Sequence, residues 1–284
     1  MVLLNPISSQ HLTMPHLERV LAKYTADPAA GFPFSVPVIG SLRELEFDPG
    51  VTFFVGENGS GKSTLLEAIG LAAELPMVGT EEGARDPSLQ QQRALAKGLG
   101  LVWRHRTRRG FFLRAEDFFG WQRRLVRERV EFEARLDEID REYRAQGRSE
   151  LALGLAKGPL AGSLHDMERR YGRDPDARSH GEAFLNLFQS RFTPGSLVLL
   201  DEPEAALSPQ SQLGLLAMLM EMVGRESQFV IATHSPIILG FPGARIYSFE
   251  GGRIERARYD DLEHVRLTRD FLTDRDRFLR RLSG

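Results

Sequence analysis

The chain has 284 residues, enough to bury a sizeable hydrophobic core in one large domain or two small ones. Its 37 basic residues are nearly balanced by 39 acidic ones, so the whole molecule is not a polycation built for nucleic acid, although one face could still be basic. The sequence has no cysteine, which excludes disulfide bonds and thiolate zinc sites, and no apolar run approaches the roughly 20 residues that span a bilayer. We therefore expect a cytoplasmic protein with no stable insertion into a membrane.

The N-terminal part is predicted to be a short helix followed by strands. A helix is expected over residues 16–24, and strands are expected over residues 34–39 and 42–47. Residues 51–55, Val-Thr-Phe-Phe-Val, form an apolar run that is typical of a buried parallel strand. A helix over residues 63–74 is predicted to follow it.

Residues 56–64 read Gly-Glu-Asn-Gly-Ser-Gly-Lys-Ser-Thr, which is the GxxxxGK[ST] pattern of a phosphate-binding loop. Small residues allow successive backbone N–H groups to wrap a phosphate at the positive end of a helix dipole. Lys62 is expected to reach the β- and γ-phosphates, and the Ser63 hydroxyl is expected to bind Mg²⁺. The sequence therefore predicts ATP and Mg²⁺ as ligands, with further nucleotide contacts from Gly56, Asn58, Gly59, Ser60, Gly61 and Thr64.

The middle of the chain, residues 76–181, is predicted to be a helical, lid-like insertion. Residues 99–106 and 110–114 are expected to form two strands that flank a basic turn. Residues 121–148, rich in Arg and Glu, are expected to form a charged helix with a solvated face. Residues 154–181 are rich in glycine and are expected to be irregular.

Strands and helices alternate again in the last third of the chain. Helices are predicted over residues 182–192 and 209–223, apolar strands over 197–200 and 229–232, and a hairpin over 245–255. Alternating strands and helices with apolar strands indicate an α/β fold with a mostly parallel central sheet, here with an antiparallel portion.

Two acidic residues follow the apolar strand of residues 197–200. Asp201 is expected to hold Mg²⁺, and Glu202 is expected to act as the general base on the attacking water. Acidic residues are common at strand ends, so this interpretation depends on the phosphate-binding loop beside them.

Three further segments carry a resemblance to a known family. Residues 179–182 read Ser-His-Gly-Glu, residues 201–209 read Asp-Glu-Pro-Glu-Ala-Ala-Leu-Ser-Pro, and residues 232–236 read Ala-Thr-His-Ser-Pro. In this order the set resembles the ABC ATPase superfamily, in particular its non-transporter branch near SMC and RecF proteins, and a group of small bacterial predicted AAA/ABC-type ATPases. The resemblance implies a P-loop NTPase fold of the ABC type in a single domain over residues 1–284. Its core would comprise about residues 31–75 and 182–284.

Members of that superfamily form dimers that enclose two ATP molecules. The resemblance implies an ATP-dependent homodimer in which Ser179 and Gly181 contact the γ-phosphate bound to the opposite protomer. Ser179 could equally cap the following helix, with Glu182 completing a capping box, and the two roles are compatible. The resemblance also implies that His234 contacts the γ-phosphate during catalysis.

The sequence departs from the family pattern in two places. The segment Ser-His-Gly-Glu replaces the LSGGQ of transporters, and no clear Q-loop glutamine is present. Glu116 is expected to stand in for that glutamine near Mg²⁺ and the attacking water. Gln90, Gln91 and Gln92 lie nearer to Lys62 but are expected in a solvated loop. Phe34 could stack on adenine or belong to the core.

Three functions are compatible with these motifs. The first is a switch-like ATPase that acts on nucleic acid, DNA or RNA, or on a partner protein. Its basic turn could contact phosphates or be simply hydrated, and it contains Arg104, Arg106, Arg108 and Arg109. The alternatives are the ATP-binding subunit of a membrane ABC transporter and a regulatory nucleotide-binding module with little turnover.

Overall fold

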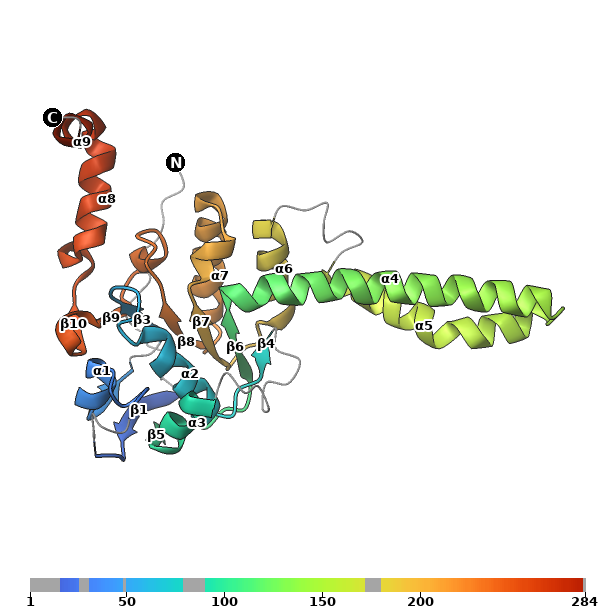
Figure 1. Ribbon diagram of the computed structural model, residues 1–284, viewed down its shortest axis with the longest axis horizontal. Coiled ribbons are helices and arrows are strands. Elements are labelled where there is room, and N and C mark those ends of the chain that lie inside the picture. Colours follow the sequence, from blue (N-terminus) through green and yellow to red (C-terminus); the bar gives the residue numbers. More distant parts are fainter. Residues whose placement is uncertain (1–15, 26–30, 48–49, 79–89, 172–179, 283–284) are drawn as a thin grey trace.

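The computed structural model describes residues 16–25, 31–47, 50–78, 90–171 and 180–282. The main sheet contains β3 (Val51–Val55), β4 (Met77–Val78), β6 (Gly110–Arg114), β7 (Leu197–Asp201), β8 (Gln228–Ala232), β9 (Arg245–Ser248) and β10 (Glu255–Ala257). Their order across the sheet is β10-β9-β3-β8-β7-β6-β4 (Figure 1). Every neighbouring pair is parallel except β9 with β10 at the edge. The predicted α/β fold with a mostly parallel sheet is confirmed.

Helices cover both faces of this sheet, as a parallel sheet requires. Every residue of β3, β7 and β8 is buried. Successive side chains of a strand point to opposite faces. Phe53 therefore packs with α6 (His180–Arg191) and α7 (Pro209–Val223), whereas Phe54 packs with α2 (Lys62–Ala72) on the other face.

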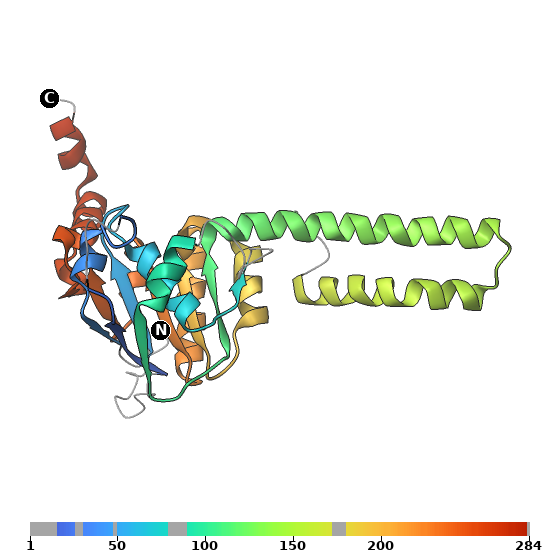
Figure 2. The ribbon, with the colours of Figure 1, turned by 60° about the horizontal axis from the view of Figure 1, so that its bottom comes forward.

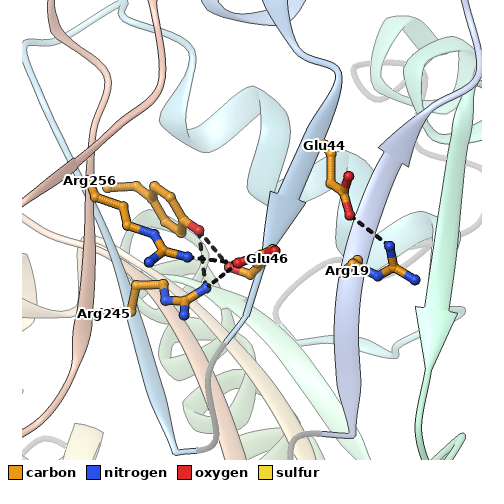
Figure 3. A network of polar contacts seen from close by, with 6 residues as sticks. Arg19, Glu44, Glu46, Arg245 and Arg256 are labelled. Carbon is orange, nitrogen blue, oxygen red and sulfur yellow. Dashed lines mark hydrogen bonds and ion pairs between the residues drawn. The ribbon is translucent and has the colours of Figure 1, made fainter.

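A second, antiparallel sheet lies on the α2 side of the core. It contains β1 (Leu17–Ala22), β2 (Glu44–Glu46) and β5 (Leu99–Trp103) in the order β2-β1-β5. Glu46 of β2 accepts hydrogen bonds from Arg256 at 2.7 Å and from Arg245 at 3.3 Å (Figure 3). The Tyr247 hydroxyl donates to the Glu46 carbonyl at 2.8 Å. These contacts join the small sheet to the β9–β10 edge of the main sheet.

The helix predicted over residues 16–24 is wrong, because this segment is strand β1. Its Leu17 and Val20 spacing fits a helix, but backbone pairing with both β2 and β5 decides the conformation. The strand predicted over residues 34–39 is also wrong. Pro37 begins the short helix α1 (Pro37–Ser41), a position where its missing N–H costs nothing, and Val38 and Ile39 are buried in the core.

The basic turn does not join two strands of a hairpin. β5 belongs to the small sheet and β6 belongs to the main sheet, so the turn connects the two sheets. The polar loop expected at residues 90–92 is instead the start of helix α3 (Gln90–Lys97), which packs against α2 through the buried Leu95.

The helical insertion is a long hairpin that extends away from the sheets (Figures 1 and 2). It consists of α4 (Ala115–Ala145) and α5 (Glu150–Tyr171), so the irregular structure expected from residue 154 is absent up to residue 171. Leu125, Ile139 and Leu153 are buried along this hairpin, and Lys157 pairs with Asp140. Packing between the two helices outweighs the low helix propensity of the glycines in α5. Residues 77–78 and 90–114 of the range predicted as insertion instead supply strands and a helix to the body of the molecule.

The chain ends in α8 (Glu263–Thr273) and α9 (Arg275–Leu282), which leave the body on the side away from the α4–α5 hairpin (Figure 1). Within the described ranges, none of the helices has the length and apolar character needed to cross a bilayer.

Candidate functional site

The phosphate-binding loop lies between β3 and α2. Gly61, directly before α2, has a φ of 101°, a left-handed conformation that favours glycine. A Cβ atom on Gly61 would lie 2.7 Å from Val38, so glycine also allows α1 to pack against the loop. The Ser60 Oγ atom is buried and has no hydrogen-bond partner among the described residues, which leaves it available to a ligand. Of the other loop residues, Asn58 and Gly59 are exposed and Thr64 is half-buried.

Lys62 lies over its own loop. Its side chain is almost fully buried, and Nζ donates to the carbonyl oxygens of Gly56 at 2.6 Å and Glu57 at 2.9 Å. Burial lowers the pKa of Lys62, and the charges of Glu202 and Asp201 oppose this shift. The ammonium group is therefore close to both the loop and the acidic residues at the end of β7.

Ser63 and Asp201 are in direct contact although 138 residues separate them. The Ser63 hydroxyl donates to Asp201 Oδ1 at 3.1 Å. Burial raises the pKa of Asp201 to about 6, and the hydrogen bond from Ser63 opposes the shift. A hydroxyl and a carboxylate are hard oxygen ligands, so this pair fits Mg²⁺.

Glu202 lies directly beyond β7 in a left-handed conformation, with a φ of 49°. Its N–H donates to the Ala232 carbonyl at 2.9 Å, which ties it to the end of β8. Glu202 lines a cavity of about 450 Å³ together with Ser63, Asp201 and Glu116. The three predicted acidic residues and the loop serine thus share one cavity.

Glu116 lies in the first turn of α4, at the mouth of the site. Its side chain is 76% exposed and pairs with Arg114 at 3.4 Å. No cluster of three or more His, Asp or Glu side chains that could hold a metal ion occurs in the described part of the chain. The role of Glu116 near Mg²⁺ stays a prediction.

His234 follows β8 and lines a neighbouring cavity with Glu204 and Tyr259, not the cavity of Ser63 and Asp201. Its backbone N–H donates to Glu204 Oε1 at 2.5 Å, while its Nε2 atom is buried and has no hydrogen-bond partner within the described ranges. Burial lowers the pKa of His234, with a further decrease from the positive charge of Lys62. His234 is thus close enough to Lys62 for the charge of the ammonium group to affect its pKa.

Gly181, from the segment Ser-His-Gly-Glu, does not line the cavity of Ser63 and Asp201. Ser179 falls outside the described residues. Gly181 is buried in the first turn of α6, where an added Cβ would lie 2.7 Å from Ser211 Oγ of α7. Gly181 therefore packs against α7 and not against the phosphate-binding loop of its own chain.

Two segments of the chain match protein-family models. Residues 38–74, which contain the phosphate-binding loop, match a family described as "AAA domain". Residues 183–240, which contain Asp201, Glu202 and His234, match a family described as "AAA domain, putative AbiEii toxin, Type IV TA system". The chain contains an AAA/ABC-type ATPase domain.

This ATPase domain has relatives among ATP-binding proteins of ABC transporters. It is 29% identical over 209 residues to the macrolide export ATP-binding/permease protein MacB of Salmonella typhimurium, covering 70% of this chain and 28% of that protein. It is 27% identical over 198 residues to a "Putative ABC transporter ATP-binding protein" of Methanosarcina acetivorans, covering 68% of this chain and 67% of that one. The chain thus spans little more than a quarter of the length of MacB.

Solved structures similar to the ATPase domain include the Smc head domain with an extended coiled coil bound to the C-terminal domain of ScpA, from Pyrococcus furiosus. That likeness has a TM-score of 0.44 and 14% identity and covers 93% of this chain and 100% of that one. A nucleotide-free ATP-binding cassette from an ABC transporter gives a TM-score of 0.41 and 17% identity, covering 80% and 87% of the two chains.

Sequence reasoning missed a buried charged pair beside Asp201. Arg114 ends β6 in register with Asp201 of β7, and its Nη2 atom lies 2.9 Å from Glu67 Oε1 of α2. Only 13% of the Arg114 side chain and 7% of the Glu67 side chain are exposed. Both line the cavity with Asp201. The sequence feature that could have indicated this pair is Arg114, a charged residue at the end of the apolar strand Gly110–Arg114, which lies next to the strand that ends in Asp201.

Glu67 should make the stability of the ATPase domain depend on pH. Burial raises the pKa of Glu67 to about 7 from an ordinary 4.5, and the Arg114 guanidinium opposes the shift. Because the pKa of Glu67 is higher in the folded than in the unfolded protein, protonation of Glu67 stabilises the fold. This contribution is complete below the unfolded-state pKa and is lost as the pH rises through 7. The free energy of unfolding of Glu67→Gln, relative to that of the wild type, should therefore rise by about 2 kcal/mol between pH 5.5 and 8.

Urea unfolding of both proteins at the two pH values measures this difference. Glu74→Gln, at an exposed position just beyond the same helix, is the matched control and should show no such trend. Equal pH dependence in Glu67→Gln and the wild type would contradict the assignment.

Proposed function

We propose that the chain binds ATP with Mg²⁺ and hydrolyses it to ADP and phosphate, using the cavity between the phosphate-binding loop and the end of β7. The observation that carries this proposal is the contact between Ser63 and Asp201, which brings the loop and the acidic strand end together. ATP is supplied in the cytoplasm, and we place the activity there.

The phosphate-binding loop and Lys62 would bind the nucleotide. Backbone N–H groups at the start of α2 favour an anion, because they are the positive end of the helix dipole. Lys62 Nζ already lies within 3 Å of two loop carbonyls and can exchange them for phosphate oxygens. The buried Ser60 hydroxyl, which has no hydrogen-bond partner in the described part of the chain, adds a donor at the same loop.

Ser63 and Asp201 would hold Mg²⁺ together with phosphate oxygens of the nucleotide. When bound, the ion neutralises negative charge that builds up during phosphoryl transfer. Burial raises the pKa of Asp201 only to about 6, which is still below 7, so most of its carboxylate is ionised and able to bind the cation at neutral pH.

Glu202 would accept a proton from the attacking water, and His234 would contact the γ-phosphate. Burial lowers the pKa of His234, so its imidazole is neutral at pH 7 and can act as a hydrogen-bond donor or acceptor. Glu202 and His234 lie at the ends of the adjacent parallel strands β7 and β8, which places both on the same edge of the sheet as the phosphate-binding loop.

A second copy of the chain would complete the site. Gly181 packs against α7 of its own chain, away from the cavity, so it could contact the nucleotide only from an opposite protomer. We propose an ATP-dependent homodimer that uses the segment containing Ser179 and Gly181 in this way.

The basic turn gives little support to a nucleic-acid partner. Arg104 pairs with Glu18 at 2.8 Å and Arg106 pairs with Glu74 at 3.5 Å, so carboxylates offset two of its four arginine charges. Arg108 and Arg109 are exposed. Phosphate contacts depend on uncompensated basic charge, and these two positions alone would bind DNA or RNA weakly.

A role as the ATP-binding part of a membrane transporter is the second candidate. The relatives in Salmonella and Methanosarcina favour it, since their printed names are those of ABC transporter ATP-binding proteins. Against it, the chain continues after β6 into the α4–α5 hairpin, and the first residues of α4 are Ala115 and Glu116 instead of a glutamine.

Hydrolysis of ATP by the purified chain tests the proposed activity. We expect phosphate release from ATP in the presence of Mg²⁺ and at least about a 100-fold loss when EDTA removes the metal. Release of phosphate is followed in single-turnover conditions with protein in excess. Full activity in EDTA would contradict a Mg²⁺-dependent site, and no release with bound ATP in Mg²⁺ would favour the regulatory module.

A further inference from the structure

Glu204 makes two hydrogen bonds to the segment that carries His234. It lies in the short helical turn η3 (Pro203–Ala206) that follows Glu202. Its Oε2 atom accepts from the Thr233 hydroxyl at 2.8 Å, and its Oε1 atom accepts from the His234 backbone N–H at 2.5 Å. One carboxylate thus holds two successive residues beyond β8.

These two bonds belong to a closed ring of polar contacts. The Thr233 hydroxyl also accepts from the Ser235 N–H at 3.0 Å, and the Ser235 hydroxyl donates to Gln212 Oε1 at 2.5 Å. The Gln212 amide donates to the carbonyl of Leu207, the residue after η3, at 3.1 Å. The ring therefore begins and ends on η3 and passes through the His234 segment and α7.

No side-chain hydrogen bond among the described residues orients the His234 imidazole. Its buried Nε2 atom has no hydrogen-bond partner among the residues that the structure describes, and the nearest ring is His264, with centroids 6.4 Å apart. The direction of the imidazole therefore depends on packing and on the backbone of His234, and the Glu204 side chain holds this backbone.

Backbone contacts extend the same unit to Glu202. The Glu202 N–H donates to the Ala232 carbonyl, and the Ala205 N–H donates to the Glu202 carbonyl at 3.0 Å. Two routes consequently connect Glu202 with His234. One is the backbone hydrogen bond between the ends of β7 and β8, and the other passes through Glu204.

We propose that Glu204 is a positioning residue for ATP hydrolysis, which fixes the backbone of His234 and thereby aims its imidazole at the reacting phosphate. This inference rests on the proposed function of the site. Glu204 acts through His234 and does not itself touch ATP. The loss of its two hydrogen bonds should slow the chemical step and leave nucleotide affinity nearly unchanged.

Single-turnover hydrolysis and ATP affinity of five single variants and one double variant test the proposal. Glu204→Ala removes both acceptors, and the rate should fall by about 100-fold, the cost of a small misplacement of a catalytic group. The dissociation constant for ATP should change by less than about threefold, since Glu204 does not contact the nucleotide and the binding of ATP in the ground state is unaffected. Glu204→Gln should stay within about fivefold of the wild type, because its carbonyl can accept from His234 N–H and its amide can donate to Thr233 Oγ1.

Thr233→Val provides a near-isosteric variant that keeps the fold if Glu204→Ala does not. It removes one of the two bonds to Glu204, together with the bond from the Ser235 N–H, and its rate should fall by about tenfold. Tyr259→Phe is the matched control. The Tyr259 hydroxyl donates to the Pro236 carbonyl at 2.9 Å, so this variant loosens the same segment two residues beyond His234 without affecting the Glu204 bonds. Its rate should equal that of the wild type.

His234→Ala separates failure of this inference from failure of the proposed function. Glu204→Ala should cause no further loss of rate in the His234→Ala background, because both act through one imidazole. A wild-type rate in His234→Ala would remove the proposed role of His234 itself. A slow His234→Ala with wild-type rates in Glu204→Ala and Thr233→Val would overturn the positioning role alone. Equal losses in Glu204→Ala, Glu204→Gln and Tyr259→Phe would also overturn it, since they would indicate general loosening of the segment.

Discussion

Replacement of Glu202 by glutamine is expected to slow ATP hydrolysis by at least about 100-fold while ATP and Mg²⁺ remain bound. Glutamine has the shape of glutamate but cannot accept the proton of the attacking water. The left-handed backbone at Glu202 and its bond to Ala232 do not involve the side chain, so the substitution should leave the strand end intact. Lys62, Ser63 and Asp201 keep their places and their charges.

The same variant is expected to accumulate as a dimer. If ATP bridges two protomers and hydrolysis releases them, a protein that binds ATP without turning it over should stay assembled. Size-exclusion chromatography with light scattering, in ATP and Mg²⁺, measures the mass. Glu221→Gln is the control, because Glu221 is exposed on α7 and pairs only with the neighbouring Arg225 in the contacts described. A monomeric Glu202→Gln variant with bound ATP would show the homodimer to be wrong.

The trapped dimer also decides between nucleic acid and a protein as the partner. Binding of a short duplex DNA at low salt, lost steeply as salt rises, would indicate phosphate contacts by the basic turn. We expect no such binding, because Glu18 and Glu74 offset two of the arginines in the turn.

Replacement of Lys62 by alanine is expected to weaken ATP binding by at least about 100-fold, because a charge-assisted contact to two phosphates is lost inside a buried site. The Lys62 side chain is 4% exposed, so no other cation can easily take its place. Its loss also removes a positive charge that partly offsets Asp201 and Glu202, which adds repulsion toward the nucleotide.

Calorimetric titration with a slowly hydrolysed ATP analogue in Mg²⁺ measures this loss. Lys97→Ala, at the exposed end of α3, is the control and should bind as the wild type does. A thermal melt establishes that Lys62→Ala is folded. Wild-type affinity in a folded Lys62→Ala variant would remove the central assignment of the site.

The parts of the site that are local in sequence could be predicted from the sequence. The apolar run Val51–Val55 followed by closely spaced glycines and Lys62 determines a strand, a tight loop and a helix start, because each depends on neighbouring residues. The apolar run that ends in Asp201 is of the same kind. Parallel strands bring their carboxyl ends to one edge, so two such local patterns also predict one shared site.

Residues whose roles depend on a distant partner could not be predicted in this way. Glu204 is one of several acidic residues after β7, and only the structure places it against Thr233 and His234. Arg114 and Glu67 are unremarkable in the sequence, and burial beside Asp201 makes them a charged pair. Their contacts link residues that are tens of positions apart, and no local pattern records such contacts.

The amino-acid sequence by itself thus determined the α/β alternation, the phosphate-binding loop and the acidic strand end. Tertiary structure alone decided that residues 17–22 pair as strand β1, since their apolar spacing also suits a helix. It likewise decided that the glycine-rich α5 is helical, because packing along α4 outweighs its weak local preference. Where the local conformational preference is strong, the sequence is enough to predict the secondary structure. Where it is weak, packing or pairing with a distant segment determines the conformation.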